Sequence, residues 1–321
     1  MKPEIVEQNK ILELRVGSHL YGTNTENSDE DFCGVFIPPI NYYFGLDTVN
    51  EADLSIKSKL ENGRNSKDAV DRKFYELRKF VKLAIDNNPS IIEMLFVNKE
   101  NIVFHNYFGE ALLDNKHLFP YKECYHRFKG YAISQSRKML VKSGNMKDLK
   151  LGLDLLEDIV RDELRSPKYV FEVERGLCHS PYFSDNGNQH LFVGDIYIQK
   201  NITIKRAIEQ IQERVNKFGN RKELIEDYGF DVKFAGNVIR LLKQCKELLD
   251  TGEIVFPLKE KDLILDIKRG KYNLQEVNDL IEDCQDDCDI SFEKSELPKK
   301  PRYDEINKLL MRTLKDWFVC Y

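Results

Sequence analysis

The first hundred residues alternate between short apolar runs and turn-prone polar segments. Period-two alternation predicts one strand at 11–16, which ends at Gly17-Ser18, and a second at 31–37, which Pro38-Pro39 stops. A short helical turn at 18–22 and a polar loop are expected between these strands. Two further strands are predicted at 52–57 and 69–74, with a turn at 62–65. Apolar residues then recur at a helical period up to about residue 85. These elements together predict a mixed α/β module.

Beyond residue 110 the apolar spacing becomes mostly helical. Separate amphipathic stretches are predicted around Phe128–Met139, 149–164, 204–215, 234–249 and 306–317. The segment 169–198 interrupts them with a strand-like, turn-rich pattern. The turn residues Asp185-Asn186-Gly187-Asn188 predict a hairpin tip there. The sequence therefore predicts an α+β fold with two domains. Residues 1–110 form a mixed β-sheet with flanking helices, and residues 111–321 form a mostly α-helical domain with a strand-like insertion at 169–198.

Composition narrows the class of protein. The 321 residues carry 49 Lys and Arg against 54 Asp and Glu, a formal net charge of −5, so bulk nucleic-acid binding by the whole chain is not favoured. No apolar run approaches the roughly 20 residues that a membrane helix needs. The amino-terminal residues lack the basic-then-apolar pattern of a signal peptide. Seven scattered cysteines are typical of reduced thiols. We therefore expect a cytoplasmic protein with no membrane partner.

The candidate chemistry lies in residues 15–35. Gly17 lacks a Cβ, so the backbone there can approach a ligand closely, and Ser18 places a hydroxyl and free N–H groups at the start of the next helix, where phosphate oxygens bind well. Asp29 and Asp31 are two residues apart, which puts both carboxylates on one face of an extended chain. A divalent cation relieves the repulsion between such carboxylates. Taken singly, a Gly-Ser turn and an Asp-x-Asp loop are ordinary surface features. In this order they predict a metal and phosphate site.

The combination resembles a known superfamily. A strand, Gly17-Ser18, a short helix and then Ser28-Asp29-x-Asp31 on a following strand is similar to the nucleotidyltransferase fold of the DNA polymerase β superfamily. The wider pattern, with Tyr21-Gly22 and Gly34-Val35, resembles the RNA-ligase-associated (RlaP-like) group of predicted nucleotidyltransferases of bacteria and phages. Four further segments of the chain, 71–80, 88–96, 231–242 and 251–271, also resemble this group. Residues 145–225 resemble it least.

The resemblance implies roles for particular residues. Gly17 and Ser18 hold nucleotide phosphates, and Asp29 and Asp31 ligate the metals. A third carboxylate on a neighbouring strand completes the catalytic and metal-binding set, and we assign it to Asp71. Asp53 and Glu51, on the adjacent predicted strand, remain alternatives.

Two further regions are candidates for the substrate. In the helical block, Lys233 and Arg240 stand two turns apart and are expected to reach a triphosphate, although Asn237 replaces the histidine often found in the family. Residues 121–150 contain eight Lys and Arg but only two acidic residues, with aromatic residues interleaved. Such a helix either contacts RNA or is a solvated helix whose aromatic residues face the core.

The sequence thus predicts an enzyme, a metal-dependent nucleotidyltransferase of the two-metal type. It would use Mg²⁺ or Mn²⁺ and transfer a nucleoside monophosphate from an NTP to a hydroxyl acceptor, with an RNA end or tRNA expected, in the cytoplasm of a bacterium or a phage-infected host. Two alternatives stay open: a nucleotide- or RNA-binding protein without turnover, and a nucleotidylating toxin that acts on protein or tRNA. The sequence does not define the acceptor, the base of the NTP or the oligomeric state.

Overall fold

The chain divides by its internal contacts into two compact units. The computed structural model describes residues 2–26, 28–56, 70–161, 168–185, 187, 189–218, 225 and 227–320, apart from the side chains of 140–143 and 320. The predicted turn at 62–65, and residues 57, 69, 186 and 188 of the predicted strands and hairpin tip, lie outside this part. The first unit contains Met1–Ile133, Gly236–Ile267 and Glu276–Tyr321, and the second contains Ser134–Ala235 and Lys268–Gln275. The domain boundary expected near residue 110 stays a prediction.

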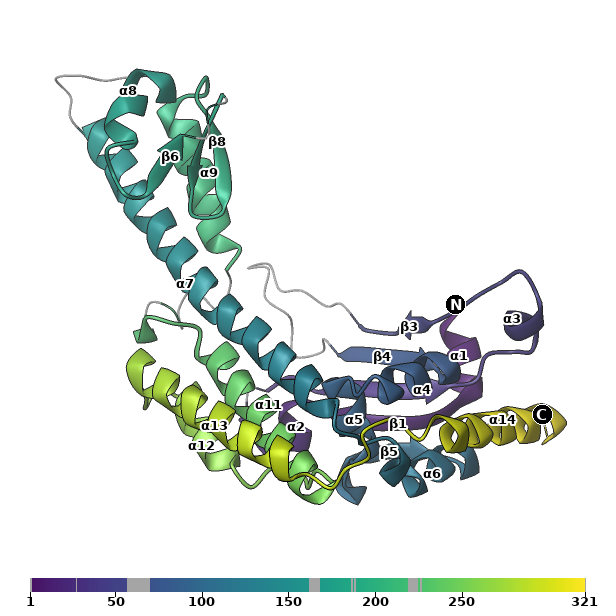
Figure 1. The fold of residues 1–321 in the computed structure, drawn as a ribbon. Helices are drawn as coiled ribbons and strands as arrows, with labels where there is room; N and C mark the ends of the chain where they lie inside the picture. Colours follow the sequence, from purple (N-terminus) through teal and green to yellow (C-terminus); the bar gives the residue numbers. More distant parts are fainter. Residues whose placement is uncertain are drawn as a thin grey trace. The chain divides into compact units, whose positions relative to one another are not determined.

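The first unit is built on a five-stranded mixed sheet with the order β3-β4-β2-β1-β5 (Figure 1). Its strands are β1 (Lys10–Val16), β2 (Asp31–Phe36), β3 (Glu51–Asp53), β4 (Asp71–Glu76) and β5 (Ile102–His105). β2 and β4 run parallel, and the other neighbouring pairs are antiparallel. This sheet, with its flanking helices and the helical carboxy-terminal region, confirms the predicted α+β class.

Side-chain caps mark the start of helices α4 and α5 in the first unit. The helices and 3₁₀ turns that lie wholly or partly in this unit are α1 (Pro3–Asn9), α2 (Ser18–Tyr21), α3 (Asn41–Phe44), α4 (Leu77–Ile85), α5 (Pro89–Leu95), η1 (Lys99–Asn101), α6 (Tyr107–Asp114), η2 (Lys116–Leu118), α7 (Cys124–Arg161), α11 (Val232–Thr251), α12 (Lys261–Lys268), α13 (Leu274–Lys294) and α14 (Tyr303–Cys320). The Glu76 carboxylate accepts the N–H of Lys79 at the start of α4. The Asn88 side chain accepts the N–H of Ser90 at the start of α5, where Pro89 occupies the first turn. These caps fix the chain immediately after β4.

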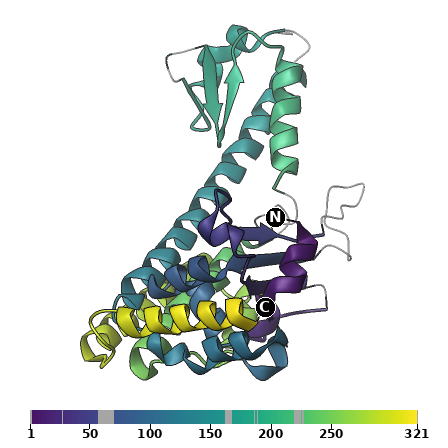
Figure 2. The same cartoon turned by 90° about the vertical axis from the view of Figure 1, so that its right-hand side faces the viewer.

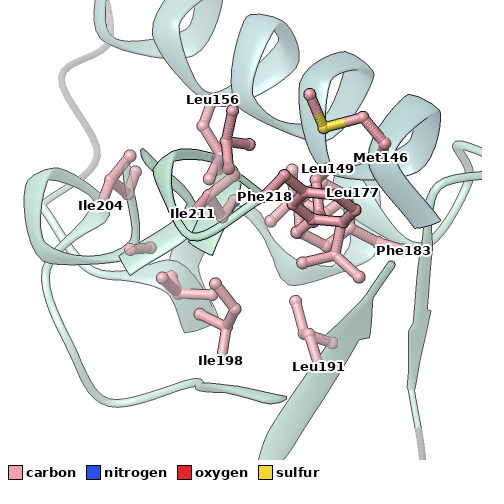
Figure 3. Packing of buried hydrophobic residues seen from close by; sticks show 14 of the residues in the cluster. Met146, Leu149, Leu156, Leu177, Phe183, Leu191, Ile198, Ile204, Ile211 and Phe218 are labelled. Carbon is pink, nitrogen blue, oxygen red and sulfur yellow. The ribbon is translucent and has the colours of Figure 1, made fainter. Parts of the chain in front are cut away.

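The second unit packs a small antiparallel sheet against helices. Its sheet has the order β6-β7-β8, and the strands lie side by side (Figure 2). The elements are α8 (Val170–Leu177), β6 (Phe183–Asp185), β7 (His190–Val193), β8 (Ile196–Gln199) and α9 (Ile204–Asn216). One face of the sheet contributes Leu191, Val193 and Ile198 to a buried apolar cluster, together with side chains from α7 and α9 such as Leu149 and Ile211 (Figure 3). Strands therefore form within the predicted strand-like segment 169–198, but its first part is helix α8.

Two sequence-based boundaries differ from the structure. The amphipathic stretch predicted at 128–139 and residues 149–161 of the one predicted at 149–164 belong to one helix, α7, of 38 residues; residues 162–164 lie outside the described part. Strand β5 and helix α1 were not predicted. Among the described residues, no helix combines the length and the apolar character that crossing a membrane requires.

Candidate functional site

The turn after β1 brings backbone against a carboxylate. Gly17 has φ +68° and ψ −142°, which an L side chain rarely adopts, and it immediately precedes α2. A Cβ built on Gly17 would lie 2.6 Å from Oδ2 of Asp31. Gly22 ends α2 in a left-handed conformation, and its N–H donates to the carbonyl of His19. A glycine at position 17 therefore satisfies both the local backbone conformation and the close approach of Asp31.

Asp31 and Asp71 begin two neighbouring parallel strands. They are register partners in the β2–β4 pair, so both carboxylates lie at the same edge of the sheet. Asp29 precedes Asp31 by two residues and is exposed. Burial raises the pKa of Asp31, and the negative charges of Asp71 and then Asp29 raise it further, whereas His19 opposes the shift. Asp71 and Asp29 are therefore both near enough to act electrostatically on Asp31.

A hollow of about 420 Å³ opens beside these acids. Its walls include Gly17, Asp31, Asp71 and Asp53, with Ser90 and Glu93 contributed by α5. Of the other predicted residues, Ser18, Asp29 and Arg240 are not part of this lining. Carboxylates thus gather on one side of a space that a small ligand can enter.

The alternatives for the third carboxylate occupy different environments. Glu51 pairs with Nζ of Lys73 at 3.0 Å and is absent from the lining of the hollow. Asp53 lines the hollow, and its Oδ1 accepts the N–H of Ser55 at 3.0 Å. Asp71 lines the hollow and also acts on the pKa of Asp31. This arrangement favours Asp71, followed by Asp53.

The donor chemistry suits a hard divalent cation. Aspartate oxygens are the ligands that Mg²⁺ prefers. Burial raises the pKa of Asp31 most and repulsion from Asp71 and Asp29 adds to it, and a bound cation would relieve that repulsion. Nε2 of His19 is buried without a hydrogen-bond partner in this region. Within the described residues, however, no three His, Cys, Asp or Glu side chains are arranged as a metal cage. The residue types therefore fit a cation, although the side chains do not converge on one.

Arg240 belongs to a buried network behind the hollow. Its Nη1 pairs with Oε1 of Glu93 and donates to Oε1 of Gln244 at 2.9 Å. Its guanidinium lies 4.4 Å from the ring centre of Tyr21, whose hydroxyl donates to Oε2 of Glu93 at 2.7 Å. Burial raises the pKa of Tyr21 well above its ordinary value. Arg240 thus links α11 to α2 and α5, and the expected contact with a triphosphate stays a prediction.

Sequence reasoning assigned no role to Glu93. A signal was present, because this acid stands alone in the apolar run Ile91-Ile92-Glu93-Met94-Leu95-Phe96 and is buried in the structure. A buried carboxylate needs a charged or hydrogen-bonding partner. Its partner, Arg240, is 147 residues away along the chain, so the pair could not be identified from local spacing.

Lys233 and the basic aromatic helix remain separate candidates. Lys233 is exposed, belongs to the second unit, and its backbone N–H donates to Oδ1 of Asp231 at 3.1 Å. In the segment 121–150, Phe128 is buried and Tyr125 stacks on Phe292 with ring centres 4.4 Å apart. These two aromatic rings therefore serve packing, whereas Tyr131 is 42% exposed.

Comparison with known proteins agrees with the geometry. Residues 5–162 match a family described as RlaP, the RNA repair pathway DNA polymerase beta family. This part of the chain is similar to the RlaP family. It contains all five strands of the mixed sheet together with Gly17, Asp29, Asp31 and Asp71.

Two individual proteins are also similar. An uncharacterized 38.9 kDa protein of Enterobacteria phage T4, from the nrdC-mobD intergenic region, is 27% identical over 302 residues, covering 88% of this chain and 89% of the phage protein. The crystal structure of a nucleotidyltransferase-like protein from Exiguobacterium sibiricum has 9% identity and a TM-score of 0.25, covering 89% of this chain and 69% of that one.

Proposed function

We propose that this chain is a divalent-metal-dependent nucleotidyltransferase that moves a nucleoside monophosphate from an NTP to a hydroxyl of an RNA acceptor. The observation that carries the proposal is the placement of Asp31 opposite Asp71, at one edge of the sheet and against the backbone of Gly17. The RNA acceptor is supported by the family description, which names an RNA repair pathway. The phage T4 relative is consistent with action in the cytoplasm of a bacterium or a phage-infected host.

The proposed reaction assigns metal binding to the aspartates and phosphate binding to the glycine-serine turn. Asp29 and Asp31 would supply carboxylate oxygens to Mg²⁺ or Mn²⁺, and Asp71 would complete that set. A bound cation supplies charge neutralisation for the triphosphate and the departing pyrophosphate. Gly17, which has no side chain, lets the backbone approach the phosphates, and Ser18 adds a hydroxyl at the start of α2.

The reaction balances without a further reactant. The acceptor oxygen forms a bond to the α-phosphorus, while the bond from that phosphorus to the bridging oxygen breaks and pyrophosphate leaves. The proton of the acceptor hydroxyl passes to a carboxylate, for which Asp71 is placed at the edge of the hollow. Burial raises the pKa of Asp31, and the neighbouring negative charges of Asp71 and Asp29 raise it further. Those negative charges are the physical reason for a cation requirement.

The test is a transfer assay with several acceptors in parallel. Purified protein is incubated with each of the four NTPs, α-labelled, in Mg²⁺ or Mn²⁺, with total RNA, protein or small-molecule hydroxyls. Label on RNA with release of pyrophosphate is the expected result. The Asp29→Ala variant should lose transfer. Because the Asp29 side chain is exposed, the variant should keep the melting temperature of the wild type. Transfer by Asp29→Ala near the wild-type rate would contradict the proposal.

A binding protein without turnover is the second candidate, and the lack of a converged metal cage among the described residues favours it. Nucleotide binding without pyrophosphate release under every metal condition would support this candidate. Label appearing on protein in place of RNA would instead identify a nucleotidylating enzyme with a protein acceptor.

A further inference from the structure

The outer face of the small sheet in the second unit carries aromatic side chains, of which Tyr197 is exposed and Phe192 and His190 are half-buried. Register places Phe192 opposite Tyr197 on neighbouring strands, and both alternate with the residues that enter the buried cluster. The ring centres of Phe192 and Tyr197 are 5.2 Å apart, and His190 lies on the same face with its ring centre 6.4 Å from that of Tyr197. Tyr197 is 63% exposed.

A cleft extends this aromatic surface to helix α8. The cleft has a volume of about 850 Å³ and is lined by Phe171 and His190, together with the polar residues Gln189 and Asn201. Phe171 is 55% exposed and stacks on Tyr169, with ring centres 5.7 Å apart and an angle of 15° between the planes. The aromatic surface therefore consists of the residues Tyr169, Phe171, His190, Phe192 and Tyr197, which we call the aromatic platform.

The charges around the aromatic platform favour a polyanion. Its carboxylates are engaged, since Glu174 and Asp185 both bind Lys200, and Glu172 accepts the backbone N–H groups that begin α8. Two exposed cations, in contrast, have side chains with no carboxylate partner among the described residues. These are Lys168, whose Nζ lies over the Tyr169 ring, and Arg175, which lines a hollow with Phe171.

The same sign of charge holds for the whole second unit. Its residues include 20 Lys and Arg against 16 Asp and Glu, whereas the first unit has 29 against 38. The chain as a whole has a net charge of −5, but its second unit is net positive. Positive charge beside exposed rings is what single-stranded nucleic acid requires, because phosphates are attracted and bases stack on the rings.

We propose that the aromatic platform binds single-stranded RNA by base stacking, and that the second unit thereby holds the acceptor strand. This inference rests on the proposed function for its choice of RNA. Phe171 and Tyr197 act as the main stacking rings, with the amides of Gln189 and Asn201 available to base edges or ribose hydroxyls in the cleft. Bases in a duplex are already stacked and paired, so duplex RNA binds more weakly.

The experiment measures RNA binding apart from catalysis. The full chain is titrated onto a fluorescein-labelled single-stranded RNA of about ten nucleotides, within the usual site sizes for such surfaces, and fluorescence anisotropy is followed in EDTA without NTP. Phe171→Ala and Tyr197→Ala should each weaken binding roughly 5- to 150-fold. Tyr303→Ala is the matched control, because Tyr303 is 59% exposed and lies on α14 of the first unit. Thermal melting should be unchanged in all three variants, because the removed rings are largely exposed.

The outcomes separate this proposal from the proposed function. Asp31→Asn should bind the RNA as the wild type does. Wild-type affinity in the Phe171→Ala and Tyr197→Ala variants, or no measurable RNA binding by the wild type, would overturn the platform even if nucleotidyl transfer is found. Tighter binding of duplex RNA or of single-stranded DNA of the same sequence would also overturn it. Loss of RNA binding in both platform variants, with the control unaffected, supports the platform even if the transfer assay fails.

Discussion

Gly17 and Asp31 are in direct contact across the end of the β1–β2 pair, because the Asp31 carboxylate occupies the space that a Cβ on Gly17 would fill. Because of this contact, the glycine-serine turn and the aspartate pair, which are separate in the sequence, lie side by side in the structure. It also explains why the turn excludes a side chain on two grounds, the positive φ of Gly17 and the position of the Asp31 oxygen.

Replacing Gly17 with alanine should therefore damage activity more than stability. The added methyl group displaces Asp31, and misplacing a catalytic group by about 1 Å costs roughly a hundredfold in rate. The strained backbone should lower the free energy of unfolding by about 1–3 kcal/mol. Transfer kinetics and thermal melting measure the two effects. Gly130→Ala, on helix α7 with nothing near its Cβ, is the control and should not reduce transfer; equal rates for Gly17→Ala and wild type would contradict the assigned role.

Asp31→Asn should raise the melting temperature of the metal-free protein while abolishing transfer. Burial and the neighbouring acids raise the pKa of Asp31 above its ordinary value of 3.8, so its ionised form destabilises the folded state. The gain should be full above the folded-state pKa and disappear as the pH falls below 3.8, where the aspartate is protonated in both states. Melting curves from neutral to acid pH measure this trend.

Adding Mg²⁺ should reverse the order of the two melting temperatures, so that the wild type becomes more stable than Asp31→Asn. A cation that binds the folded wild type stabilises it by mass action, and Asp31→Asn removes one of its ligands. The wild type should therefore gain more in melting temperature on adding Mg²⁺ than the variant gains. Equal gains in both proteins would argue against a metal role for Asp31.

The sheet was predictable where its residues alternate and much less so where they do not. β1, β2 and β4 carry apolar residues at period two or lie beside clear turn residues, and sequence reasoning found them. β5 was not predicted because it is an edge strand without a clear alternation of buried and exposed residues, and its Val103 is 53% exposed. Helix α7 was divided in two because its middle is polar, although a single helix of 38 residues continues through it.

The candidate site shows the same division. The Gly17, Asp29 and Asp31 motif is local, so its spacing alone pointed to a shared site. The pairing of Asp31 with Asp71 depends on the order of strands in the sheet, which composition and periodicity do not define. The Glu93–Arg240 pair depends on a long-range packing contact and was not foreseen.

The third carboxylate can be identified with matched neutral variants. Asp71→Asn should reduce transfer severely, because it removes the acid opposite Asp31 while keeping its size. Glu51→Gln should have little effect on transfer, since Glu51 itself does not line the hollow and its exposed pair with Lys73 contributes about 0–1 kcal/mol. Rates at saturating NTP and Mg²⁺ measure the difference. If Asp53→Asn lost activity while Asp71→Asn kept it, the assignment would move to Asp53.

The Glu93–Arg240 pair should behave as a structural unit behind the hollow. Arg240→Met leaves the Glu93 carboxylate buried with only the Tyr21 hydroxyl, so we expect a loss of about 3–5 kcal/mol in unfolding free energy. Glu93→Leu should lose a similar amount by stranding Arg240. The double variant should recover much of the stability, because no uncompensated charge remains. Denaturant unfolding of the four proteins gives the coupling energy directly. If Arg240→Met instead kept its stability and raised the KM for NTP, Arg240 would be a triphosphate ligand, as the sequence predicted.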